Sequence, residues 1–232
     1  MSSIAERIAK IRNQLPDRVR LIAVTKQVTV DAMREAYAAG VRDFGESRIQ
    51  EAASKQAQLQ DLTDVTWHMI GRLQSNKAKK ALEQFQWIHS VDNLKLAQRL
   101  DHLAEQLATP PSVCLQVKMR SDPNKTGWTV AELMADLPAL DQCKFLKIQG
   151  LMTIPPLGLN DLEILELFRE TRELAAKIRK ENWSTMRIQQ LSMGMSDDYH
   201  LAIQEGATMV RLGRIVFGER PISLNTIAGE ER

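Results

Sequence analysis

The chain has 232 residues, 44% of them hydrophobic and 26% charged, and a formal net charge of +2 at pH 7. This length suits one domain of α/β type or two small ones, and it allows a core that needs neither disulfides nor metals for stability. The balanced charge excludes the strongly basic surfaces that bind nucleic acid or membranes non-specifically, and no apolar run is long enough for a membrane span. Cys114 and Cys143 lie in apolar surroundings without CxxC spacing, so we expect buried thiols, with no disulfide and no metal site.

The first predicted element is an amphipathic helix within residues 1–15. Ile4, Ile8, Ile11 and Leu15 recur there at helical spacing, with charges of both signs between them. Such a pattern is typical of a helix that packs one face on a core, and not of a signal peptide. We therefore expect a cytoplasmic protein.

Short β-type runs then alternate with helical ones. A helix is predicted over residues 29–40, where Gly40 ends it, and a longer one over residues 159–182, which begins with an Asn-Asp pair suited to an N-cap. The eight predicted strands are 21–25, 41–45, 65–70, 87–91, 112–117, 147–154, 188–194 and 209–213.

This alternation predicts the fold class. Strict β-then-α order indicates parallel strands joined by right-handed crossovers, and eight such units after a leading helix predict a (β/α)8 TIM barrel. A doubly wound open sheet also alternates, but no G-x-G-x-x-G follows the first strand. Since there is no linker, repeat or low-complexity tract, residues 1–232 are predicted to form a single domain.

Polar residues follow several strands, at the end of a barrel where active sites lie. Lys26 comes directly after the first strand, while "SMGMSDD" (192–198) and "RLGR" (211–214) accompany the last two. Their glycines, serines and two guanidinium groups suit an anion, and barrels often bind phosphate at these loops. Because the last strand closes against the first, a phosphate held there would lie near Lys26.

A lysine beside a bound phosphate suggests Schiff-base chemistry. A partly desolvated lysine loses its proton more readily and can then attack an aldehyde. Pyridoxal 5'-phosphate (PLP) carries both groups, but a phosphorylated ketose in a lyase or aldolase satisfies the same geometry. The residues alone leave these alternatives open, and a lysine after a strand is usually just a solvated strand end.

The remaining candidates have ordinary structural explanations, with one exception. We expect His68, His89 and His102 to be structural and His200 to lie on a helix surface. Arg211 is harder to explain in this way, because a charge inside a barrel wall needs a partner.

Seven motifs resemble those of the YggS/PROSC family of PLP-binding proteins. The family is similar to the N-terminal barrel of alanine racemase, PLP fold type III, and the resemblance implies that barrel without the racemase's C-terminal β-domain. The motifs, in order between residues 20 and 219, are "LIAVTK", "FGESRIQE", "WHMIGRLQSNK", "HSVD", "GLMTI", "LSMGMSDDYHLAI" and "VRLGRIVFG".

The resemblance implies roles for six residues around PLP. Lys26 would be the Schiff-base lysine, and Arg211 would face the pyridine nitrogen. The phosphate would be held by Ser196, Gly213 and Arg214, with Met195 lining the same loop.

Three further positions belong to the family's motifs without an assigned role. Asn76 and Lys77 lie in a motif near the pocket. Ser47 stands where the family commonly has Asn, and its shorter hydroxyl would weaken a contact to the cofactor ring.

The resemblance leaves the choice between enzyme and carrier to the residues. Arginine is a permanent donor, so Arg211 would keep the pyridine nitrogen unprotonated and a poor electron sink. A racemase also needs a base on each face of the substrate carbon, and neither Tyr37 nor Tyr199 is an obvious second base.

We therefore expect a non-catalytic PLP-binding protein with no catalytic residues. Its family is associated with intracellular vitamin B6 homeostasis and with amino and keto acid balance, holding PLP as a Schiff base and making it available to apo-enzymes. The alternatives are a small PLP-dependent amino-acid racemase and a cofactor-independent Schiff-base lyase. A monomer is expected, because the racemase's C-terminal dimerisation partner has no counterpart.

Overall fold

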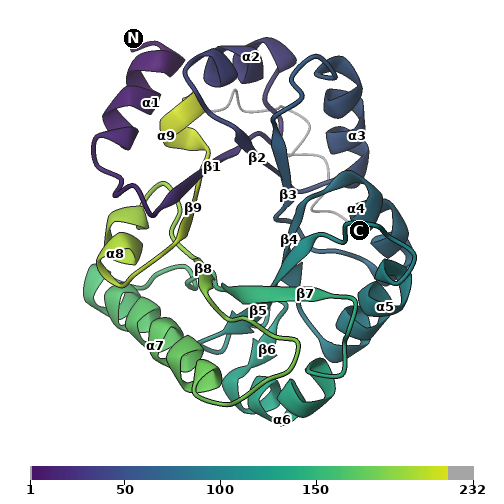
Figure 1. The fold of residues 1–232 in the computed structure, drawn as a ribbon. Coiled ribbons are helices and arrows are strands. Elements are labelled where there is room, and N and C mark those ends of the chain that lie inside the picture. Colours follow the sequence, from purple (N-terminus) through teal and green to yellow (C-terminus); the bar gives the residue numbers. More distant parts are fainter. Residues whose placement is uncertain (1, 219–232) are drawn as a thin grey trace, which may run out of the picture.

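A ring of parallel strands surrounded by helices makes up the computed structural model (Figure 1), which describes residues 2–218. The polar tail at residues 224–232 lies outside this range. Among the described residues, no helix is both long enough and apolar enough to cross a membrane.

The elements alternate along the chain as the sequence predicts. The strands are β1 (Arg20–Val24), β2 (Asp43–Glu46), β3 (Thr66–Met69), β4 (Trp87–Val91), β5 (Ser112–Lys118), β6 (Trp128–Thr129), β7 (Lys147–Met152), β8 (Gln190–Ser192) and β9 (Met209–Leu212). The helices are α1 (Ile4–Arg12), α2 (Val30–Ala38), α3 (Ile49–Gln58), η1 (Ser75–Lys77, a 3-10 turn), α4 (Ala78–Gln84), α5 (Leu94–Ala104), α6 (Val130–Leu140), α7 (Asp161–Arg179), α8 (Tyr199–Gln204) and α9 (Arg214–Phe217).

Eight of these strands close into a barrel. They are ordered β4-β3-β2-β1-β9-β8-β7-β5, all pairings are parallel, and β5 pairs back with β4. The predicted (β/α)8 barrel is thus confirmed. The two-residue strand β6 pairs only with β5, and it is too short to have a recognisable sequence pattern.

Some strands are shorter than predicted. β8 spans only residues 190–192 of the predicted 188–194, and its register pairs Gln190 with Gly150 and Ser192 with Met209. At Gly150 the two strands approach so closely that a Cβ would meet the Gln190 carbonyl oxygen, so the chain requires glycine there.

Helix caps fix where several helices begin. Ser3 and Asn160 each close a capping box, at the start of α1 and of α7. Asn160 is thus the N-cap that the sequence predicts. The predicted helix over 29–40 is observed as α2, and Gly40 follows its C-cap with φ +91°, a conformation that favours glycine.

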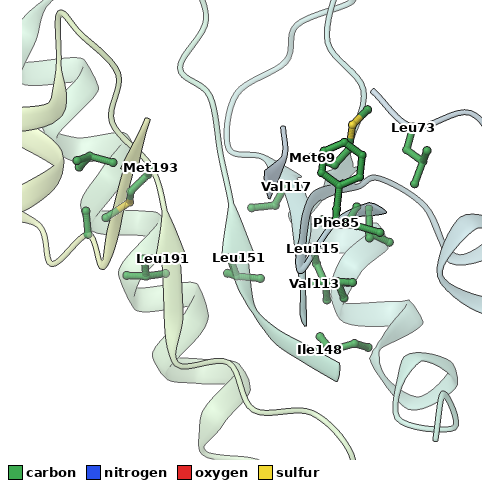
Figure 2. Packing of buried hydrophobic residues seen from close by; sticks show 14 of the residues in the cluster. Met69, Leu73, Phe85, Val113, Leu115, Val117, Ile148, Leu151, Leu191 and Met193 are labelled. Atoms are coloured by element: carbon green, nitrogen blue, oxygen red, sulfur yellow. The ribbon is translucent and has the colours of Figure 1, made fainter. Parts of the chain in front are cut away.

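The larger core cluster lies outside the strand ring, where strand residues meet the helices. Figure 2 shows members of this cluster on neighbouring strands, among them Leu115, Leu151 and Leu191. A smaller apolar cluster faces the barrel interior and consists of Ile22, Cys114, Met152 and Met209. Side chains alternate between the two faces of each strand. Arg211 pairs in register with Ile22 and therefore shares that interior face.

Candidate functional site

A cavity of about 610 Å³ opens at the carboxyl ends of β1, β8 and β9. Its walls combine apolar side chains, such as Val24, Ile70 and Ile154, with cationic and hydroxyl groups. The structure brings all six residues that the sequence singles out to this cavity. They are Lys26, Met195, Ser196, Arg211, Gly213 and Arg214.

Strand order explains why these residues meet. β9 pairs with β1 on one side and with β8 on the other, so the last strand does close against the first. Lys26 follows β1, residues 195–196 follow β8, and Arg211 lies in β9 with Gly213 and Arg214 directly after that strand. Parallel strands present their carboxyl ends at one mouth of the barrel.

Arg211 lies at the bottom of the cavity with a fixed guanidinium. It is only 4% exposed. Its Nη1 donates to Ser192 Oγ at 2.6 Å, and its Nη2 donates to the Thr153 carbonyl at 3.0 Å. Burial lowers the pKa of Arg211 to about 10, so the group stays protonated at neutral pH. The partner expected for a charge in the barrel wall is therefore a pair of neutral oxygens.

The residues on both sides of Lys26 are held by hydrogen bonds. Thr25 Oγ1 donates to Glu46 Oε1 at 2.6 Å, and the Gln27 backbone N–H donates to Glu51 Oε1 at 2.5 Å. Gln27 has φ +60°, the left-handed region that a residue other than glycine rarely adopts. These bonds fix the backbone that carries the half-buried Lys26 into the cavity.

Lys55 joins these contacts into one network. Its Nζ donates to the Thr25 carbonyl at 2.6 Å, to Glu46 Oε1 at 2.8 Å and to Glu51 Oε1 at 2.7 Å. Burial raises the pKa of Glu46, while the bonds from Lys55 and Thr25 oppose that rise. Lys55 is not predicted from the sequence, where its only signal is its place on the helix that follows the motif containing Glu46 and Glu51.

The loop after β8 is held by its own contacts. Asp198 accepts a hydrogen bond from the Met195 backbone N–H at 2.6 Å, and burial raises the pKa of its carboxyl. Arg214 forms an ion pair with Asp197, and both side chains are exposed. An incoming anion would therefore compete with Asp197 for the Arg214 guanidinium.

The site fits a small phosphorylated aldehyde such as PLP. The cavity volume lies within the range of about 300–1,000 Å³ common for ligand sites. One side offers an amine, from Lys26, and another offers the Ser196 hydroxyl and the Arg214 guanidinium. Val24 and Ile154 also line the cavity and offer apolar surface to an aromatic ring.

Of the three motif positions without an assigned role, Ser47 lines this cavity and Asn76 and Lys77 do not. Gly71 packs so tightly on the Ser47 backbone that a Cβ there would clash. Asn76 is exposed, and Lys77 instead lines a neighbouring cavity of about 290 Å³ that also contacts Ser47.

The histidine, tyrosine and cysteine predictions have mixed outcomes. His68 and His89 are buried and His200 is exposed on α8, as predicted, whereas His102, expected to be structural, is exposed on α5. Cys114 and Cys143 are buried free thiols.

Neither tyrosine lines the cavity. Tyr37 donates to Asp64 Oδ1 at 2.6 Å, and Tyr199 donates to Gln14 Oε1 at 2.5 Å.

Known proteins resemble this chain over most of its length. A family model described as alanine racemase, N-terminal domain, matches residues 1–221. A pyridoxal phosphate homeostasis protein from Synechocystis is 53% identical over 89% of this chain and 94% of its own length. One from Escherichia coli K12 is 35% identical over 96% and 99%.

Solved structures show the same fold. PipY of Synechococcus elongatus, in a structure described as having PLP bound, is 53% identical with a TM-score of 0.89, covering 93% of this chain and 100% of PipY. Alanine racemase of Clostridium difficile is 15% identical with a TM-score of 0.73, and the match covers 94% of this chain but 57% of the racemase. At that identity the likeness concerns the fold alone. The chain belongs to the alanine racemase N-terminal domain family and, within it, to the YggS/PROSC group.

Proposed function

We propose that the chain binds PLP covalently through Lys26 and serves in intracellular PLP homeostasis, without turnover of its own. The observation that carries this proposal is the meeting of Lys26, Arg211 and the Ser196 loop around one cavity. The names of the relatives and the PLP described in the PipY structure support it.

Each residue has a distinct task in this proposal. PLP supplies an aldehyde that condenses with an amine and a phosphate that needs donors. Lys26 provides the amine. Ser196 and the backbone at Gly213 donate to the phosphate, and Met195 shapes their loop. Arg214 leaves its ion pair with Asp197 and binds the phosphate instead. Arg211 donates toward the ring nitrogen and keeps it unprotonated.

The absence of turnover rests on what the cavity offers. A racemase needs a second base on the face opposite the lysine. Tyr37 and Tyr199 bond elsewhere, and the one carboxylate among the described lining residues, Asp197, pairs with Arg214 at the exposed rim. With Arg211 in place of a carboxylate, carbanion stabilisation is also weak.

The remaining features belong to the same proposal. The chain acts as a single PLP-binding domain over residues 1–232, as a cytoplasmic monomer, and releases PLP to apo-enzymes. Gel filtration coupled to light scattering tests the monomer, and transfer of PLP to a purified apo-aminotransferase tests the release.

The visible absorption spectrum, before and after borohydride, tests cofactor binding. We expect a band above 400 nm that borohydride removes, leaving a reduced adduct on Lys26. Lys26→Ala should lack both, while Lys77→Ala, beside the neighbouring cavity, should keep both. A protein that takes up no PLP overturns the proposal. Amino-acid racemisation that Lys26→Ala abolishes would favour the racemase instead.

A further inference from the structure

A line of polar side chains crosses the barrel interior behind Arg211, and all of them are buried except the partly exposed Asp43. Arg211 Nη1 contacts Ser192 Oγ, which lies 2.7 Å from His89 Nδ1. His89 Nε2 lies 2.9 Å from His68 Nδ1, and His68 Nε2 lies 2.8 Å from Asp43 Oδ1. The five side chains come from β9, β8, β4, β3 and β2, so the line runs across the ring of Figure 1.

The chemistry of the two end groups, together with neutral histidines, sets the direction of each hydrogen bond. Arg211 can only donate and the Asp43 carboxylate can only accept, so Ser192 Oγ accepts from Arg211 and, with both histidines neutral, donates its own proton to His89 Nδ1. His89 Nδ1 is then an acceptor, which places the His89 proton on Nε2. That proton is donated to His68 Nδ1, and the His68 proton on Nε2 is donated to the Asp43 carboxylate.

One competing arrangement has to be considered. A doubly protonated His68 would form an ion pair with Asp43 and donate to His89 Nε2, which would place the His89 proton on Nδ1, toward Ser192. Ser192 Oγ would then accept from both His89 and Arg211, and its own proton would lose the acceptor at His89. Burial argues against this arrangement, since His68 and His89 are fully buried and burial lowers the pKa of both.

We propose that Ser192, His89, His68 and Asp43 form a one-directional hydrogen-bond relay that positions the Arg211 guanidinium in the cavity. Both histidines in it are neutral and carry their proton on Nε2. The relay adds the attraction of a carboxylate to Arg211 without a direct ion pair, because the aligned dipoles of the intervening groups point from the cation to the anion.

The far end of the relay lies at the opposite mouth of the barrel. Asp43 borders a second cavity of about 390 Å³ at the amino ends of β1 and β2, where Arg20 lies 3.6 Å from its carboxylate. The Arg20 guanidinium also lies 5.7 Å from the Trp87 ring centroid. The relay thus connects the candidate PLP site to a solvent-facing cavity through the barrel interior that also holds Ile22, Cys114, Met152 and Met209.

Nitrogen NMR of the protein labelled with 15N-histidine, prepared without PLP, tests the protonation pattern. We expect His68 and His89 each to show an unprotonated Nδ1 and a protonated Nε2 at pH 7, assigned through His68→Gln and His89→Gln. A doubly protonated His68, or an Nδ1-protonated His89, overturns the relay. The protonation pattern itself is read from the wild-type spectrum, and the two variants serve only to assign its resonances.

Ser192→Ala tests whether the groups are coupled. It removes the donor to His89, and in a relay the change extends to the Nδ1 resonance of His68, which Ser192 does not contact. The matched control is Thr171→Val, which removes a buried hydroxyl that bonds only within α7, to the Leu167 carbonyl. An unchanged His68 resonance in a folded Ser192→Ala protein overturns the coupling.

A third measurement concerns positioning and rests on the proposed function. Ser192→Ala should raise the dissociation constant for PLP about tenfold, since Arg211 loses a charge-assisted hydrogen bond, whereas Thr171→Val should leave it within about twofold. An equal effect of the two variants refutes the positioning role. If wild-type protein takes up no PLP while the NMR pattern holds, the proposed function fails and the relay stands.

Discussion

Replacing Lys55 by methionine tests the network that holds the backbone around Lys26. The Lys55 side chain is 9% exposed and that of its partner Glu46 is fully buried. Methionine keeps the length of the side chain and donates nothing, so Glu46 retains only the Thr25 hydroxyl. Breaking a buried ion pair by removing one partner costs about 3–5 kcal/mol. For Lys55→Met we expect the free energy of unfolding to fall by about 3 kcal/mol at pH 7.5. This is the low end of that range, because Glu51, the other partner of Lys55, is partly exposed and remains solvated.

The loss should also depend on pH. Burial already raises the pKa of Glu46 above its usual 4.5, and without Lys55 the pKa rises further. A carboxyl with a higher pKa in the folded than in the unfolded protein favours folding only while it is protonated. The destabilisation therefore grows as the pH rises from the unfolded pKa through the folded one and then stays constant. Lys55→Met should lose less stability at pH 5 than at pH 7.5.

Urea unfolding followed by tryptophan fluorescence at both pH values measures these losses. Arg34→Met is the control, since it removes an ion pair of similar length, with Asp61, whose side chains are 41% and 59% exposed. We expect little change there, and Glu46→Gln combined with Lys55→Met should recover most of the loss. A loss below about 1 kcal/mol, as for an exposed pair, or an equal loss at both pH values would refute the reasoning.

Three further predictions use the same unfolding assay or a thiol titration. Gln27→Val should lower the free energy of unfolding by about 1–2 kcal/mol, because a β-branched residue is strained at φ +60°, and Gln27→Gly should lower it less. Gly150→Ala should cost about 3 kcal/mol through its clash with β8, against about 1 kcal/mol for Gly158→Ala, which has positive φ but open space. Burial raises the pKa of Cys114 to about 12 and of Cys143 to about 11, so a thiol reagent at pH 8 should modify neither until urea unfolds the protein. Equal costs for the two glycines, no cost for Gln27→Val, or reaction of the folded thiols would contradict these expectations.

The sequence by itself determines the barrel and the mouth at which the candidate site forms. The β-then-α alternation requires parallel strands, and parallel strands share one polarity. The sequence alone therefore predicts that Lys26, the Ser196 loop and Arg211 meet at one mouth of the barrel. The β6 strand was missed, because two residues carry no periodicity.

Only the tertiary structure decides which side chains contact those residues inside the barrel. Ser192 and His89 are 103 residues apart, and Arg211 and the Thr153 carbonyl are 58 apart. Their contacts depend on which side chains face the barrel interior and at what height, and a shift of one residue in strand register would turn each side chain to the other face. The sequence fixes neither that register nor the closure of β5 on β4, and both are consequences of packing the whole ring at once.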